Sequence, residues 1–260
     1  MGVVNVTPDS FSDGGLYLSA DAAVVHAEKL AGEGADILDV GGESTRPGAD
    51  PVPLEAELER VLPVVERLAS RGARISIDTR KAEVASAALE AGASIVNDVS
   101  AFRHDPSMAG LVADAGAGCC LMHMLGDDPR TMQADPRYDD VVSEVKAFLS
   151  ERLAFAVAEG VPEERVWLDP GIGFGKTIDH NLELLRRLDE IVALGRPVLV
   201  GASRKSFLGR LTGRAERERN AATIATTVLA YERGASVFRV HEVRGTVDAL
   251  KVAAATLRTP

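Results

Sequence analysis

The chain alternates short apolar runs with longer amphipathic segments from its first residues to its last, and this alternation limits the folds open to it. Most of the short runs are continuously apolar, a pattern typical of parallel strands that are covered on both faces. Strands are expected at residues 2–6, 36–40, 74–77, 94–97, 118–122, 166–168, 197–201 and 236–240. Helices are expected after them, at residues 20–33, 54–70, 82–90, 107–115, 139–159, 179–193, 218–233 and 246–257.

Eight strand–helix units in 260 residues predict an α/β fold of the (β/α)8 or TIM barrel class, since such a barrel typically takes about 250 residues. A doubly wound open sheet is the alternative. No linker rich in Pro or Ser and no shift in composition divides the chain. We therefore expect a single domain over residues 1–260.

The boundaries of the expected helices carry suitable residues. Ser19 and Asp179 stand where N-caps are wanted, and Pro53 stands at a helix start. Glycines follow five of the helices, where a residue with left-handed backbone is common: Gly34, Gly92, Gly160, Gly195 and Gly234.

The charge balance restricts the class of partner. The chain has 29 Lys and Arg against 39 Asp and Glu, a formal net charge of -10. This excess of acid argues against nucleic acid, because phosphate contacts need a surplus of basic residues on one face. A small anion in a local basic pocket remains compatible with the charge.

Nothing in the sequence predicts a membrane protein or a secreted one. No apolar run approaches the roughly 20 residues that span a bilayer. The first residues lack the charged and apolar regions of a signal peptide. Cys119 and Cys120 are adjacent within an apolar run and are interpreted as buried core residues rather than a disulfide. We therefore expect a cytoplasmic protein.

Polar side chains cluster at the carboxyl ends of the expected strands, where barrel enzymes build their active sites. The residues at these ends include Asn5, Asp78, Asn97, His123, Asp169, Lys205, Arg239 and His241. Asp78 or Asn97 alone is also compatible with a helix cap. Packing does not require the whole set at one barrel mouth, so the set predicts a ligand with several polar edges and a negative charge.

The glycine-rich segment at residues 170–177 resembles a phosphate-binding loop but departs from its pattern. That pattern needs Gly at the first position, where this chain has Pro170. The glycines are better explained by a tight loop that approaches the site closely, with Phe174 at its tip.

Eight motifs together resemble dihydropteroate synthase. They are NVTPDSFSDGG (5–15), DVGGESTRPG (39–48), SIDT (76–79), NDVS (97–100), LMHM (121–124), DPGIGFGK (169–176), GASRKS (201–206) and RVH (239–241). They occur in the family's order from residue 3 to about residue 251. The first and seventh are highly specific.

The resemblance implies a (β/α)8 barrel that joins p-aminobenzoate to 6-hydroxymethyl-7,8-dihydropterin diphosphate and releases diphosphate. This is a transferase reaction of folate biosynthesis. The resemblance further implies Mg2+ as cofactor, inhibition by sulfonamide drugs, and a homodimer. Its small-molecule substrates would be its partners, with no nucleic acid and no membrane.

The resemblance also implies roles for residues of this chain. The pterin ring would be held by Asp78, Asn97, Asp169 and Lys205, with Met122 and Gly201 lining the pocket. Diphosphate would be bound by Thr45, Arg239 and His241, and Asn5 would hold Mg2+. The p-aminobenzoate would be surrounded by Phe11, Pro47, Phe174 and Ser206, with Asp13 and Arg46 on two closing loops. The residues implied as catalytic are Asp13, Arg46, Lys205, Arg239 and His241.

The chemistry of the side chains agrees with these roles. A carboxylate such as Asp169 accepts from the donors of a pterin edge, an amide such as Asn97 does both, and Lys205 donates to the ring carbonyl. Arg239 lies at the end of the eighth expected strand, near the usual anion site of a barrel. Two alternatives remain at this point, a methyltetrahydrofolate-binding methyltransferase domain and a catalytically weak pterin-binding paralogue.

Overall fold

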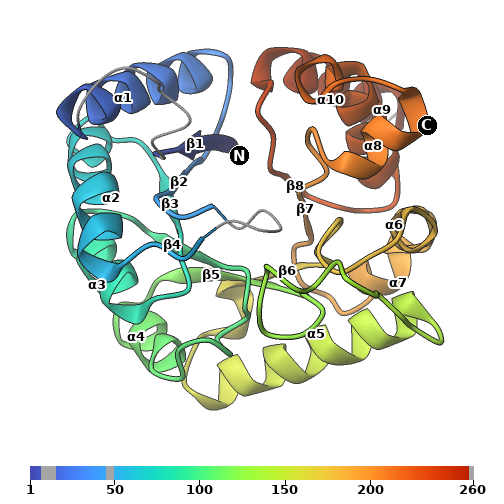
Figure 1. The fold of residues 1–260 in the computed structure, drawn as a ribbon, viewed down its shortest axis with the longest axis horizontal. Coiled ribbons are helices and arrows are strands. Elements are labelled where there is room, and N and C mark those ends of the chain that lie inside the picture. The colour runs from blue at the N-terminus through green and yellow to red at the C-terminus, as the bar shows by residue number, and fades with distance from the viewer. Residues whose placement is uncertain (7–15, 45–49, 258–260) are drawn as a thin grey trace.

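The strands of this protein form a closed ring of parallel neighbours surrounded by helices, as a computed structural model shows for residues 1–6, 16–44 and 50–257 (Figure 1). The strands are β1 (Gly2–Asn5), β2 (Leu38–Gly41), β3 (Ile75–Asp78), β4 (Ile95–Asp98), β5 (Gly118–Met122), β6 (Val166–Asp169), β7 (Leu199–Val200) and β8 (Val237–Phe238). The helices are α1 (Leu16–Gly32), α2 (Leu54–Ala69), α3 (Ala82–Glu90), α4 (Met108–Asp114), α5 (Val141–Ala158), α6 (Ile178–Arg186), α7 (Leu188–Val192), α8 (Ser206–Thr212), α9 (Asn220–Glu232) and α10 (Val243–Leu257).

Strand pairing closes the ring and confirms the predicted barrel. Strands β1 to β6 pair in sequence order, and β7 pairs with β8, all in parallel. Two further parallel bridges join these sheets, one between Leu168 and Val198 and one between Gly2 and Val240. A doubly wound sheet would leave two open edges and reverse its strand order, so that alternative is excluded.

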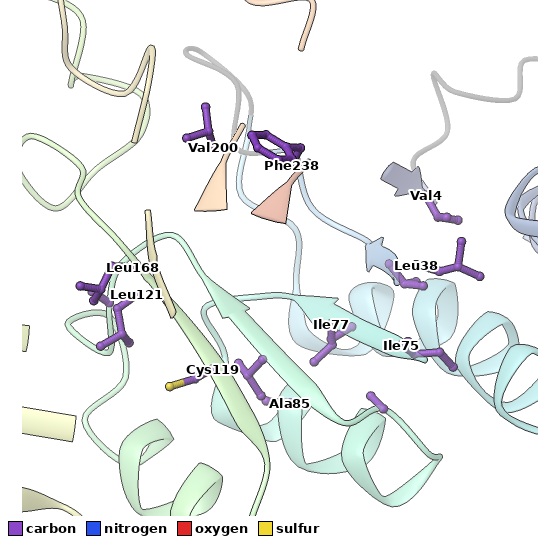
Figure 2. Packing of buried hydrophobic residues seen from close by; sticks show 14 of the residues in the cluster. Val4, Leu38, Ile75, Ile77, Ala85, Cys119, Leu121, Leu168, Val200 and Phe238 are labelled. Atoms are coloured by element: carbon purple, nitrogen blue, oxygen red, sulfur yellow. The ribbon is translucent and has the colours of Figure 1, made fainter. Parts of the chain in front are cut away.

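Alternate residues along each strand have different surroundings. Val4, Leu38, Ile77 and Leu121 belong to the large apolar cluster that includes helix residues such as Ala85 (Figure 2). This cluster is the outer layer of the barrel, between strands and helices. Residues of the opposite parity point into the barrel, and towards the carboxyl ends of the strands they become polar.

Several local expectations are confirmed. The five expected C-terminal glycines all have positive φ, between 78° at Gly195 and 110° at Gly92. Pro53 caps the start of α2. Cys119 and Cys120 are buried and form no disulfide. Among the described residues, no helix is both long and apolar enough to cross a bilayer.

Two expected N-caps are wrong. Helix α1 already begins at Leu16, so Ser19 lies inside it. Helix α6 is capped by Thr177, whose hydroxyl accepts from the His180 N–H at 3.1 Å, while His180 Nδ1 accepts from the Thr177 N–H. Asp179 therefore lies in the first turn, where its negative charge is still favourable.

One expected helix is divided, and one helix is new. The helix expected over residues 179–193 is interrupted at Arg187, which separates α6 from α7. The short helix α8 was not expected at all. It follows β7 directly and begins at Ser206, beside the predicted site.

Candidate active site

Side chains from β2, β3 and β4 and from the segment after β8 converge inside the barrel. Arg239, just after β8, donates from Nε to Asp39 on β2 at 2.6 Å and from a terminal nitrogen to Asp78 on β3 at 2.7 Å. Asn97 on β4 donates from Nδ2 to the same Asp39 carboxylate at 3.2 Å. Asp39, Asp78 and Asn97 are all buried, so the predicted residues Asp78, Asn97 and Arg239 form one connected polar network through Asp39.

The charged side chains of this network are largely shielded from water. Burial raises the pKa of Asp78 to about 7, although the nearby Arg239 guanidinium opposes this shift. Burial disfavours the charged form of Arg239, but Asp39 and Asp78 outweigh it and raise the pKa of Arg239. Arg239 is therefore a permanent cation, while Asp78 changes its charge near neutral pH.

A second group of predicted residues lies on the adjoining side of the barrel. Asp169 ends β6 and accepts from the Gly171 N–H at 2.7 Å. Burial raises the pKa of Asp169, against the attraction of the Lys205 ammonium. Burial lowers the pKa of Lys205 to about 8, and Asp169 opposes this shift. A Cβ atom at Gly201 would lie 4.0 Å from Asp169 and 3.8 Å from Arg239 Cβ, so Gly201 lies between the two groups.

Lys205 links this group to the glycine-rich loop at residues 170–176. Its ammonium donates to the Ile172 carbonyl and lies 4.5 Å from the centre of the Phe174 ring. Phe174 also packs against a small apolar cluster that contains Met122. The predicted residues Met122, Phe174 and Lys205 are thereby brought together with Asp169.

The loop reaches this position through backbone that only glycine adopts easily. Gly171, Gly173 and Gly175 have φ of 66°, 82° and 66°. A Cβ atom at Gly171 would overlap the carbonyl oxygen of His123, which follows β5. The interpretation of the glycines as a close-approach loop with Phe174 is confirmed.

A buried lysine fastens the end of the loop. Lys176 donates to the Phe174 carbonyl at 3.0 Å and bonds to His123 Nδ1 at 2.9 Å. Burial lowers the pKa of Lys176 well below its usual value, and burial with the Lys176 charge lowers the pKa of His123 to about 2. The His123 imidazole is therefore neutral and accepts a hydrogen bond from Lys176. Because Lys176 is buried and bonded within the protein, it differs from the exposed lysine of a phosphate-binding loop.

The remaining predicted residues divide into two sets. In the first set, His241 bonds to the Ser203 hydroxyl through Nδ1 at 3.0 Å and through its backbone N–H at 3.2 Å. Asn5 of this set is the last residue of β1, and Ser206 is the first residue of α8, next to Lys205. The others lie outside the described residues: Phe11, Asp13, Thr45, Arg46 and Pro47.

The sequence reasoning gave no role to three residues of the site. Asp39, His123 and Lys176 stand inside quoted motifs but were not assigned. Asp39 carried a usable signal, because it is a lone acid in the apolar run of β2 and shares its parity with the mouth-facing Gly41. The position of His123 at a strand end was a signal, but its bond to Lys176 carried none, since the two are 53 residues apart in sequence and meet only in the fold.

Comparison with known proteins agrees with this site. The chain matches the family model described as pterin binding enzyme over residues 1–241. It is 52% identical to the dihydropteroate synthase of Mycobacterium leprae over 264 positions, which cover 99% of this chain and 93% of that protein.

Solved structures give the same result. The dihydropteroate synthase of Xanthomonas albilineans with 4-aminobenzoic acid has a TM-score of 0.94 at 51% identity, covering 100% of this chain and 93% of that one. A structure of the same enzyme with 7,8-dihydropteroate has a TM-score of 0.91 at 48% identity, covering 100% and 94%. The chain therefore belongs to the family of pterin-binding enzymes and, within it, to the dihydropteroate synthases, which are transferases.

Proposed function

We propose that the barrel mouth binds the pterin ring of 6-hydroxymethyl-7,8-dihydropterin diphosphate through Asp78, Asn97, Asp169 and Lys205. The observation that carries this proposal is the meeting of two buried carboxylates, a buried amide and a lysine inside one barrel. A pterin presents amino and ring N–H donors beside a carbonyl, which is the complement of this set. Met122 and Gly201 line the remaining wall.

The diphosphate is assigned to Arg239 and His241, with Thr45 from outside the described residues. Both lie after the last strand, where barrels commonly bind anions. Arg239 forms ion pairs with Asp39 and Asp78. Substrate binding then exchanges a carboxylate contact of the guanidinium for phosphate oxygens, which suit its forked donors.

We assign Mg2+ to Asn5 together with the substrate. Within the described residues, no group of three or more His, Cys, Asp or Glu side chains is arranged to hold a metal ion. Mg2+ in phosphate-binding enzymes takes one or two protein oxygens and fills its shell with substrate phosphates and waters. The amide oxygen of Asn5 at the end of β1 fits this requirement, and the ion would neutralise charge on the leaving diphosphate.

The p-aminobenzoate is assigned to the surface around Phe174 and Ser206, completed by Phe11 and Pro47. A solved structure of the Xanthomonas albilineans enzyme contains 4-aminobenzoic acid, which supports p-aminobenzoate as a substrate. Asp13 and Arg46 are assigned to the loops that cover the site. Because sulfonamides have an aniline like that of p-aminobenzoate, we expect competitive inhibition in steady-state kinetics, and a purely noncompetitive pattern would contradict this location.

The chemistry then rests on positioning and charge. The bond between the pterin methylene carbon and the diphosphate oxygen breaks, and its electron pair leaves with the diphosphate. The dihydropterin ring shares the resulting positive charge. The aniline nitrogen attacks the carbon and loses one proton. Asp78, Asn97 and Asp169 orient the ring, while Arg239 and His241 stabilise the leaving group, so no strong general base is needed.

Three further properties are proposed. One apolar cluster extends from β1 to α10, which supports a single domain.

Leu229 on α9 and Val252 and Leu257 on α10 are large, apolar and exposed, which supports a homodimer through these two helices. Sedimentation of the wild type against Val252→Glu tests the dimer. The cytoplasmic location is proposed from the sequence features alone.

The activity itself is tested with purified protein, both substrates and Mg2+. Diphosphate release should depend on p-aminobenzoate and be accompanied by 7,8-dihydropteroate. A catalytically weak paralogue would bind the pterin without releasing diphosphate, and that result would contradict the proposal. The methyltransferase alternative is not supported by the relatives, which are named dihydropteroate synthase over nearly the full chain.

A further inference from the structure

Asp39 is a buried carboxylate at the centre of the polar network, with no assigned part in binding or catalysis. It lies on β2, is 0% exposed, and shares one oxygen between Arg239 Nε at 2.6 Å and Asn97 Nδ2 at 3.2 Å. An acid kept fully buried is costly unless its partners compensate for lost water. Its retention inside an apolar strand therefore needs a reason beyond packing.

The two contacts of Asp39 fix the direction of hydrogen bonding. The guanidinium of Arg239 offers donors only, so the Asp39 oxygen that it shares with Asn97 acts as an acceptor. Asn97 must then turn its NH2 group towards Asp39. The amide oxygen, on the other branch of the side chain, is directed away from Asp39. This orientation follows from the chemistry of the partners and not from the positions of two similar amide atoms.

We infer that Asp39 is a positioning residue that orients the Asn97 amide, so that the pocket offers an acceptor to the pterin ring. The inference rests on the proposed pterin site. Through Asp39, the pocket selects rings that present an N–H donor at this place. A reversed Asn97 amide would turn its NH2 group towards the ring N–H, so that two donors face each other. The ring N–H would then be buried without an acceptor, which weakens binding.

A double-mutant cycle tests the inference. Asp39→Asn, Asn97→Ala and the double variant are titrated by calorimetry with 6-hydroxymethyl-7,8-dihydropterin, which lacks diphosphate and so does not report on the anion site. Asp39→Asn should weaken binding roughly tenfold or more, because an amide at residue 39 no longer fixes Asn97. In the Asn97→Ala background the same change should cost less than about threefold. An undiminished loss in that background, or no loss in the wild type, would overturn the inference.

Glu57→Gln is the matched control. Glu57 on α2 is also 0% exposed and accepts from Thr79 Oγ1 at 2.8 Å and from Lys81, away from Asn97. The change should lower the melting temperature but alter pterin affinity by less than about threefold. An equal loss of affinity in Glu57→Gln would attribute the effect to any buried charge and would overturn the inference.

The outcomes separate this inference from the proposed site. If the wild type does not bind the pterin, or Asn97→Ala binds it equally well, the pterin site is wrong. If Asn97→Ala loses affinity but Asp39→Asn does not, only the role of Asp39 is wrong. Should Asp39→Asn not fold, hydrogen exchange of the Asn97 side-chain amide in the free wild type decides. A protected proton supports the bond to Asp39, and rapid exchange of both protons overturns it.

Discussion

Asp78 and Lys205 both change their charge close to neutral pH, and for the same reason. Burial raises the pKa of Asp78 to about 7 and lowers the pKa of Lys205 to about 8, because each charged form loses water inside the barrel. The ring donors need an ionised Asp78, and the ring carbonyl needs a protonated Lys205. The site is therefore fully charged only in a narrow range.

We predict that kcat/KM for the pterin substrate depends on pH as a narrow bell-shaped curve. The value should rise as pH passes about 7, where Asp78 loses its proton, and fall above about 8, where Lys205 loses its own. Lys205→Arg should keep the rise and lose the fall, since a guanidinium keeps its proton. The affinity for the pterin that lacks diphosphate, measured by calorimetric titration at each pH, should follow the same profile. This ligand avoids the ionisation of the diphosphate itself. A flat profile between pH 6 and pH 9 would contradict these assignments.

We also predict that Asp169→Ala and Lys205→Ala each lose useful pterin affinity. A hydrogen bond to a charged group contributes about 1.5–3 kcal/mol, which is roughly tenfold to over a hundredfold in affinity. Lys29→Ala is the matched control, because Lys29 is an exposed lysine on α1 with only an ion pair to Glu33. Calorimetric titration checks all three variants, and unchanged affinity in Asp169→Ala or Lys205→Ala would remove that residue from the pocket.

At the scale of single elements, close contacts with the segment after β5 constrain the backbone of the loop after β6. Gly171 passes against the carbonyl of His123, and Lys176 fastens the far end of the loop to the same residue. The loop therefore carries Phe174 as a fixed wall. Its position depends on contacts between β5 and β6 that are distant in sequence.

Gly171→Ala should be far more harmful than Gly72→Ala. Both residues have positive φ, 66° and 76°, so both variants carry the strain of a left-handed residue, about 1–2 kcal/mol. At Gly72 a Cβ atom meets nothing within 4 Å, whereas at Gly171 it overlaps backbone. Urea denaturation should show a larger loss for Gly171→Ala, and calorimetry should show weaker pterin binding. Equal losses would contradict the close approach.

The sequence predicts elements well where the signal is local. The strand at residues 118–122 and the helix at residues 82–90 have the expected bounds, because apolar period and a following glycine mark them. The break at Arg187 has no local sign, since neither Gly nor Pro stands there. Arg187 is instead held by Asp140, at the start of α5, at 2.9 Å. Asp39 is visible as a lone acid in an apolar strand, but its pairing with Arg239 is not, because the two are 200 residues apart in sequence.

At the scale of the whole molecule, the same arginine spans the closure of the barrel. Strand β1 meets the segment after β8 through the Val3 N–H, which donates to the Val240 carbonyl at 3.1 Å. Inside the ring, Arg239 extends from this seam to Asp39 on β2 and Asp78 on β3. Arg239 therefore lies at the closure of the barrel and in the proposed anion site at the same time.

We predict that Arg239→Met destabilises the fold by about 3–5 kcal/mol at neutral pH, because it leaves buried carboxylates without a cation. Asp78, whose pKa burial already raises to about 7, would then take up a proton more readily in the folded state, and a raised folded pKa gives stability that is lost as pH rises. The loss should therefore be greater at pH 8 than at pH 5. Arg186→Met, at an exposed ion pair with Glu183, should change stability little. Urea denaturation at both pH values checks the difference, and equal effects of the two variants would contradict it.

The central claim is that the polar cluster inside the barrel mouth holds the pterin ring. The most direct measurement is a crystal structure of the protein with 6-hydroxymethyl-7,8-dihydropterin. The account predicts the donor edge of the ring within hydrogen-bond distance of Asp78, Asn97 and Asp169, with Lys205 at the carbonyl. A ring bound elsewhere, or a cluster left empty at saturating ligand, would contradict it.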